Sequence, residues 1–221
     1  MSVVLTEGFA PPPINKKEIL RYAGARCADA RTESLMDECI AEAEGCLVYN
    51  VCYTESTVSV GGGACVFDGF EVKSEGLSKN LSECRRALLF GATVGVGLDR
   101  LIAKYSIISP AKAVMLQAVG AERIEALCDE FCRTFEEKNK VALKPRFSPG
   151  YGDLSLECQK DIFVILGLNK NIGVTLNGSL LMTPLKSVTA FAGITDFNTQ
   201  KCKTDKCAGC DRLDCAFRGR I

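Results

Sequence analysis

Hydrophobic and polar positions along this chain follow two periods, one typical of helices and one of strands. Apolar residues three and four positions apart predict helices at residues 16–22, 32–45, about 98–105, 109–141 and about 156–168. The segment 109–141 is expected to form one long helix, or two helices with a break near Gly120. Another helix is expected to start at Ser78 or Asn80 and to run to Arg86, because polar residues favour a helix start.

Runs rich in β-branched and aromatic residues predict strands at residues 46–53, 57–60, 64–72, 88–94, 179–182 and 187–193. These strands are grouped and do not alternate strictly with helices, which favours the α+β class over a doubly wound sheet. We expect a single domain over residues 16–200, with an antiparallel sheet and flanking helices. An extended lead-in at residues 1–15, with three consecutive prolines, precedes it, and a cysteine-rich tail at residues 201–221 follows it.

Glycines punctuate two of these segments. Residues 61–63 are three glycines, which we interpret as a hairpin turn and not as a phosphate-binding loop, because no lysine with serine or threonine follows. Gly91, Gly95 and Gly97 lack the spacing of a nucleotide-binding motif. Close packing is the better interpretation of these three positions.

Charge and length exclude several classes of function. Lysine plus arginine and aspartate plus glutamate both total 27 in 221 residues, so the formal net charge is zero. Nothing in this balance favours a general nucleic-acid or membrane-surface binder. The apolar stretch near residues 87–98 is too short to span a bilayer, and the N-terminal residues lack the pattern of a secretory signal. We expect a cytoplasmic protein.

Two residue types have unusual counts. The chain has 13 cysteines, an odd number, which together with the missing export signal argues against a disulfide-stapled secreted domain. It has no histidine, which excludes Ser-His and Cys-His catalysis and histidine ligation of a metal by this chain. Any proton transfer must use a carboxylate, lysine, tyrosine, cysteine or substrate group.

Residues 144–153, Lys-Pro-Arg-Phe-Ser-Pro-Gly-Tyr-Gly-Asp, hold an arginine and a tyrosine in a loop stiffened by two prolines. Arginine suits a carboxylate through two parallel hydrogen bonds, and a tyrosine ring offers a face to a cation or a purine. An adenosyl sulfonium that bears an amino acid has all three groups. On composition alone, a surface loop with incidental charge is the preferred interpretation of the segment.

A longer resemblance decides between these interpretations. Arg146-Phe-Ser-Pro-Gly-Tyr151 resembles the Arg-x-x-x-Gly-Tyr signature of the activation domain of cobalamin-dependent methionine synthase. Residues 172–176 and 179–188 are similar to the family's Gly-x-x-Leu and Met-x-Pro-x-x-Ser-Val patterns, and residues 92–95 and 122–127 also fit. The resemblance extends over roughly residues 88–194, in the order of the family.

The resemblance implies a site for S-adenosylmethionine. By that analogy Arg146 binds the carboxylate of this cofactor, the Ser148 backbone contacts its adenosyl part, Tyr151 lies by the sulfonium, and Glu125 pairs with the ammonium group. Without the resemblance, Glu125 is a solvated helix residue and Arg146 forms a surface ion pair. The N-terminal aspartate and the late tyrosine that the family uses have no match here.

The resemblance also implies a role in reductive reactivation, in which S-adenosylmethionine and one electron restore methylcobalamin. This chain lacks the Asp-x-His-x-x-Gly motif of cobalamin binding, so the cobalamin is expected on a partner chain, a methionine synthase or related corrinoid protein. The chain is then a component of a methyltransferase system and not a complete enzyme. An electron donor is a further expected partner.

Cys202, Cys207, Cys210 and Cys215 form a C-x4-C-x2-C-x4-C pattern, which the family does not have. Four thiolates suit zinc or an iron–sulfur cluster, and the spacing does not separate these two from each other or from free thiols. Two alternative functions therefore remain. One is an iron–sulfur protein that delivers electrons to a corrinoid enzyme, and the other is an interaction module that has lost its ligand site.

Overall fold

The computed structural model describes residues 3–25 and 28–196. The chain order of its elements is β1 (Leu5–Gly8), α1 (Lys16–Tyr22), α2 (Ala30–Glu44), β2 (Asn50–Gly61), β3 (Ala64–Phe67), β4 (Phe70–Lys73), α3 (Glu75–Asn80), β5 (Arg86–Thr93), α4 (Val96–Ile108), α5 (Pro110–Asn139), β6 (Val141–Leu143), the 3-10 helix η1 (Leu156–Cys158), α6 (Gln159–Leu166), α7 (Leu168–Ile172), β7 (Thr175–Leu176), β8 (Met182–Thr183) and β9 (Ser187–Asp196).

The main sheet is antiparallel and has the strand order β4-β3-β2-β5-β9-β6. Strand β2 is long enough to pair with β1 through residues 50–53 and with β3 through residues 58–61, while β5 runs along its other edge. This arrangement confirms the α+β class with an antiparallel sheet and flanking helices. The lead-in predicted for residues 1–15 contains β1, which joins this sheet.

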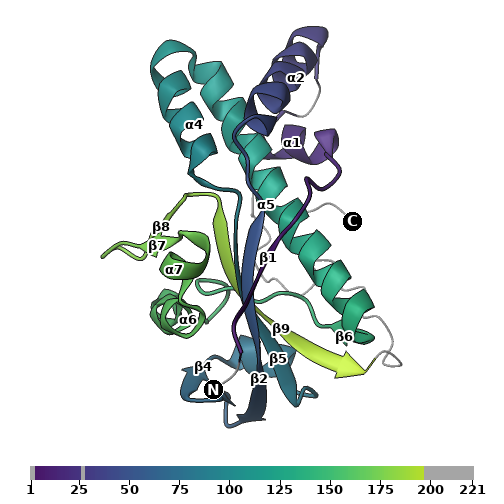
Figure 1. The fold of residues 1–221 in the computed structure, drawn as a ribbon, viewed down its shortest axis with the longest axis vertical. Helices are drawn as coiled ribbons and strands as arrows, with labels where there is room; N and C mark the ends of the chain where they lie inside the picture. The colour runs from purple at the N-terminus through teal and green to yellow at the C-terminus, as the bar shows by residue number, and fades with distance from the viewer. Residues whose placement is uncertain (1–2, 26–27, 197–221) are drawn as a thin grey trace.

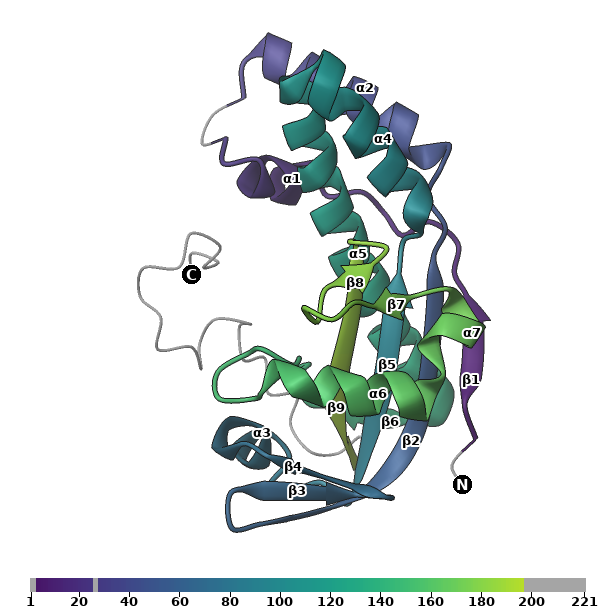
Figure 2. The ribbon, with the colours of Figure 1, turned by 90° about the vertical axis from the view of Figure 1, so that its left-hand side faces the viewer.

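Both faces of the sheet are covered, which explains why residues 87–92 of strand β5 are all apolar. Leu88 and Phe90 point into a core formed with α1, α2, α4 and α5, whereas Ala87 and Leu89 point into a second core with α3, α6 and α7. Successive side chains of a strand face opposite sides. Figures 1 and 2 show α5 crossing one face, with α6 and α7 on the other.

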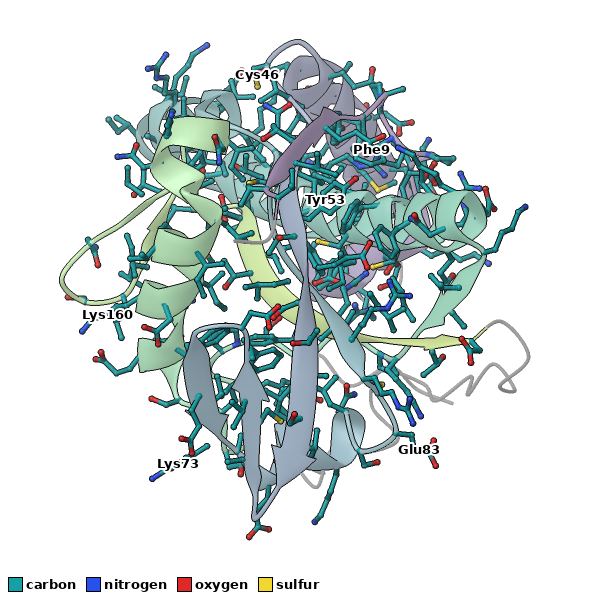
Figure 3. The ribbon with its side chains drawn as sticks, turned by 60° about the horizontal axis from the view of Figure 1, so that its bottom comes forward. Phe9, Cys46, Tyr53, Lys73, Glu83 and Lys160 are labelled. Carbon is teal, nitrogen blue, oxygen red and sulfur yellow. The ribbon has the colours of Figure 1, made fainter. Side chains whose placement is uncertain are left out.

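Helix α5 supports the first core through an aromatic cluster around Phe131. The Phe131 ring centroid lies 5.1 Å from that of Tyr53, 5.0 Å from that of Phe90 and 6.1 Å from that of Phe9. Figure 3 shows Phe9 and Tyr53 where β1 and β2 lie beside this helix. The cluster fixes α5 against the centre of the sheet, because buried aromatic pairs contribute large contact areas with specific geometry.

The three glycines of residues 91–97 lie where other parts of the chain pack closely against the backbone, as the sequence predicted. A Cβ at Gly91 would lie 2.6 Å from Leu168 Cδ2, and a Cβ at Gly97 would press against the Cys46 carbonyl oxygen. Gly95 has φ +84° and packs against Val48. Gly120 has the same role within α5, where a Cβ would lie 2.5 Å from Leu98 Cδ2, and the helix passes this glycine without a break.

Four element predictions were wrong. The strand expected at residues 64–72 is two strands, β3 and β4, which pair with each other across a turn. The strand expected at residues 179–182 is mostly a turn, and only Met182 belongs to a strand, β8. The strands expected at residues 46–53 and 57–60 are one strand, because the buried Thr54 and Ser56 hydroxyls donate to the carbonyls of Val3 and Thr57. The helix expected from residue 78 or 80 to residue 86 instead covers Glu75–Asn80, since the Ser74 side chain accepts the Leu77 N–H and caps an earlier start.

Within residues 3–25 and 28–196, no helix combines the length and the apolar character that crossing a membrane requires.

Candidate functional site

The loop that carries Arg146 leaves the sheet edge directly after β6. The Lys144 N–H donates to the Gly193 carbonyl at 2.8 Å, and Phe147 exchanges two backbone hydrogen bonds with Phe191, at 2.8 and 2.9 Å. The first half of the loop is thus an extension of the β6–β9 pairing. It holds the Arg146 backbone, between these two anchors, at the edge of the sheet.

The second half of the loop is a tight turn around Tyr151. Gly150 has φ +83° and Gly152 has φ +56°, conformations that glycine adopts without strain. The Tyr151 N–H donates to the Ser148 carbonyl at 3.0 Å, and the Tyr151 ring meets the Phe147 ring edge-to-face at 5.5 Å. The Tyr151 side chain is 43% exposed, so the turn presents an aromatic ring to solvent.

Asp153 fixes the end of this loop to α3. Its carboxylate accepts the Ser74 hydroxyl at 2.6 Å and the N–H groups of Glu75 and Gly76 at 2.6 and 3.1 Å. The Ser74 hydroxyl and these two N–H groups favour the charged form and hold the pKa of Asp153 below its ordinary value. Sequence analysis missed this role of Asp153.

Arg146 itself points away from the sheet edge and contacts α5. Its Nη2 donates to Glu125 Oε2 at 2.8 Å, and its Nη1 donates to Asp129 Oδ1 at 2.5 Å. Glu125 and Asp129 are four residues apart, so they share one face of the helix. The Arg146 side chain is 15% exposed, whereas those of Glu125 and Asp129 are 39% and 57% exposed. The guanidinium therefore lies beneath two carboxylates that reach solvent.

Two cysteines of α5 lie near the same guanidinium. Burial raises the pKa of the Cys128 and Cys132 thiols above the ordinary value, an effect that the nearby charge of Arg146 only partly offsets. Both thiols are consequently protonated at neutral pH. They are poor nucleophiles and poor metal ligands in this state.

A groove of about 360 Å³ lies on the solvent side of the two carboxylates, between α1 and α5. Its volume lies within the range of small-molecule sites. Tyr22 from α1 forms part of one wall, and burial followed by the charge of Glu125 raises the pKa of the Tyr22 hydroxyl. The full lining comprises Pro12, Pro13, Asn15, Glu18, Arg21, Tyr22, Glu122, Glu125, Ala126, Asp129, Glu130 and Arg133.

A buried ion pair of α5 holds the lead-in and the start of α1 against this helix, on one side of the groove. Arg123 and Glu122 are 2% and 3% exposed, and they contact each other through Arg123 Nε and Glu122 Oε2 at 2.5 Å. Arg123 also donates to the carbonyls of Pro12 and Pro13 at 2.5 and 2.8 Å. The Asn15 N–H, at the start of α1, donates to Glu122 Oε1 at 3.0 Å. We call these contacts the lead-in clamp.

The structure brings two of the four predicted cofactor-binding residues into direct contact, namely Arg146 and Glu125. Ser148 and Tyr151 lie in the same loop and are joined by their backbone. Asp129 is an additional member that sequence analysis missed. Its position four residues after Glu125 is the signal that identifies it, because that spacing repeats the same helix face.

The tail cysteines Cys202, Cys207, Cys210 and Cys215 lie outside the described residues, so the zinc or iron–sulfur site there stays a prediction. Within the described part, no group of three or more cysteine, aspartate or glutamate side chains could hold a metal ion.

Comparison with known proteins gives a match of structure and none of sequence. No protein-family model matches the chain, and no curated protein does. A crystal structure of the MetH reactivation domain bound to AdoHcy has a similar fold, with a TM-score of 0.64 over 86% of this chain and 78% of that chain. The sequence identity is 12%. The chain therefore has the fold of the MetH reactivation domain.

Proposed function

We propose that this chain binds S-adenosylmethionine at the groove beside Arg146 and serves reductive reactivation of a cobalamin-dependent methionine synthase, or a related corrinoid methyltransferase, on a separate chain. The observation that carries the proposal is the contact of Arg146 with Glu125 and Asp129 at the edge of a groove between α1 and α5. The fold of a domain that was crystallised with AdoHcy supports it.

The donor set fits the amino-acid end of S-adenosylmethionine. A guanidinium has five N–H donors, and Arg146 donates one hydrogen bond to each of its two carboxylate partners. Arg146 can therefore also donate to the carboxylate of a ligand. Glu125 and Asp129 present carboxylates to an ammonium group. Tyr22 lines the groove and Tyr151 presents an exposed ring from the Arg146 loop. Such rings attract cations and stack on purines.

The chain's own contribution is positioning. Bound S-adenosylmethionine supplies an electrophilic methyl group, and its transfer to a reduced corrinoid needs alignment and no proton-transfer base. A chain without histidine is compatible with that requirement. Arg146 and the carboxylates hold the amino-acid end. The lead-in clamp keeps α1, one wall of the groove, against α5, and Asp153 fixes the loop that carries Arg146 beneath the groove-lining carboxylates.

Calorimetric titration of the full chain with S-adenosylmethionine tests the proposal. Saturable binding is expected for the wild type, and Arg146→Ala is expected to weaken it at least tenfold, the effect of losing a charge-assisted bidentate contact. Arg146→Lys keeps the charge without the planar fork and is expected to fall between the two.

The matched control is Arg86→Ala, which removes an arginine that pairs with Glu55 at 2.7 Å where the central strands β5 and β2 lie side by side. Its affinity is expected to equal that of the wild type. Circular dichroism must show that every variant is folded. Absence of binding to the folded wild type contradicts the proposal, as does equal binding by Arg146→Ala.

A further inference from the structure

The groove between α1 and α5 is lined mostly by charged residues and has one flat apolar surface. Among the described residues that line it, Tyr22 is the only aromatic one, and Tyr151 is not among them. A purine is a flat ring system, and proteins bind such rings largely by stacking them on aromatic side chains. The one aromatic stacking surface that this groove offers to a purine therefore belongs to α1.

The preceding residue holds the Tyr22 ring from one side. The Arg21 guanidinium carbon lies 4.3 Å from the centroid of the Tyr22 ring, which is a cation–π contact. Arg21 Nε and Nη2 donate to Glu18 Oε2 at 3.0 and 2.7 Å, so the guanidinium is itself anchored one turn earlier on the helix. Because Arg21 covers one face of the half-buried ring, a ligand can stack only on the opposite face.

Tyr22 also lies near the carboxylates proposed for the amino-acid end of the ligand. After burial, the charge of Glu125 is the next cause of the raised pKa of the Tyr22 hydroxyl, so the two groups are neighbours across the groove. Figure 1 shows α1 lying against α5, where the Asn15 N–H donates to Glu122 Oε1. S-adenosylmethionine has its purine at one end and its amino-acid group at the other. One groove can therefore hold both ends of this molecule.

From this arrangement we infer that Tyr22 is the purine-stacking residue of the groove and determines its specificity for adenosyl ligands, with Arg21 supporting the ring from behind. The inference rests on the proposed function and deepens it. It assigns the adenosyl end of the ligand to α1, whereas the resemblance implied a contact with the Ser148 backbone.

Tryptophan fluorescence tests the position of the purine, because the chain has no tryptophan of its own. Tyr22→Trp introduces a single indole at the proposed stacking position, and a stacked purine quenches indole emission. Titration of this full-length variant with S-adenosylmethionine is expected to quench most of its fluorescence. Tyr151→Trp is expected to respond much less. Tyr105→Trp is the matched control on α4, where the tyrosine hydroxyl donates to Glu42, and its emission is expected to stay unchanged.

Calorimetric titration with S-adenosylmethionine measures what the stack contributes to affinity. Tyr22→Leu is expected to weaken binding at least tenfold, within the usual effect of losing one aromatic stacking contact. Tyr22→Phe keeps the ring and is expected to bind as tightly as the wild type, as is the control Tyr105→Leu. Circular dichroism confirms that each variant is folded. Where Tyr22→Leu does not fold or Tyr22→Trp does not bind, the other variants of Tyr22 decide.

The outcomes separate the inference from the proposed function. Quenching in Tyr151→Trp and not in Tyr22→Trp, or wild-type affinity of Tyr22→Leu, overturns the inference while the proposed function stands. Weaker binding by Tyr22→Leu together with unquenched binding by Tyr22→Trp also overturns it, because Tyr22 then only supports α1. Absence of S-adenosylmethionine binding by the folded wild type overturns the proposed function itself.

Discussion

The Ser74 hydroxyl donates to the Asp153 carboxylate at 2.6 Å, across 79 positions of sequence. With the N–H groups of Glu75 and Gly76, this contact fastens the end of the Arg146 loop to the first turn of α3. The loop is therefore held at both ends, by α3 and by the backbone pairing of Phe147 with Phe191. If this loop binds a ligand as proposed, such anchoring lowers the entropic cost of binding, because less of the chain has to be ordered.

Asp153→Asn is expected to reduce both stability and affinity for S-adenosylmethionine, because the amide is a weaker acceptor than the carboxylate. The folded-state pKa of Asp153 is lowered, so its contribution is complete above the ordinary aspartate pKa of about 4 and is lost as pH falls through the folded value. The difference in thermal stability between the two proteins should be complete at pH 7 and should shrink as pH falls below about 4. A constant difference across this range would contradict the assignment, and Glu71→Gln on β4 serves as the control.

The lead-in clamp makes a prediction about paired substitutions. Arg123→Met leaves Glu122 buried without its partner, and breaking a buried ion pair in this way costs about 3–5 kcal/mol. Adding Glu122→Met removes the orphaned charge and is expected to restore part of the stability. Urea unfolding followed by circular dichroism measures both values. A double variant less stable than Arg123→Met would show that the pair does not act as a unit.

Gly97→Ala tests the close approach of α4 to the segment before β2. Alanine has a higher helix propensity by about 1 kcal/mol, yet its Cβ would meet the Cys46 backbone carbonyl, which cannot rotate away. A net loss of about 1–2 kcal/mol is expected, typical of overpacking. Gly178→Ala, with open space around its Cβ position, should change stability by less than about 0.5 kcal/mol. A stabilised Gly97→Ala variant would disprove the close approach.

The buried thiols make a prediction about chemical labelling. Burial raises the pKa of Cys39 to about 11 and that of Cys158 to about 12. At pH 8 only about one molecule in a thousand then has a Cys39 thiolate, and the thiolate is the reactive form. Iodoacetamide followed by peptide mass spectrometry should leave both cysteines unmodified in the folded chain and label both in guanidinium chloride. Rapid labelling of the native chain at Cys39 would contradict its burial.

Much of the fold was predicted from hydrophobic periodicity, because the period of a helix or strand depends on residues that are close in sequence. The helix at residues 16–22 has the predicted bounds, and the apolar stripe of residues 109–141 is a single helix, α5. Strand β2 was divided incorrectly because Thr54 and Ser56 interrupt the apolar pattern. Their hydroxyls are satisfied by backbone carbonyls, a compensation that periodicity does not reveal.

The candidate site was predicted in part for the same reason. The resemblance of residues 146–151 to a known signature identified the loop, and the same resemblance suggested Glu125 as the partner of the ammonium group of the ligand. Arg123 and Asp153 were missed because their partners lie far away in sequence, 111 positions in the case of Arg123 and Pro12. A single sequence carries no record of such distant contacts.

Helix α5 carries the lead-in clamp at residues 122–123 and the partners of Arg146 at residues 125 and 129, within about two turns. Each residue of a helix turns the next by about 100°, so inserting or deleting one residue between Arg123 and Glu125 would rotate one contact out of phase with the other. The length of this short segment is consequently fixed. The hairpin turn between β7 and β8, which includes Gly178, lies apart from α5, so a change of length there is expected to keep both contacts.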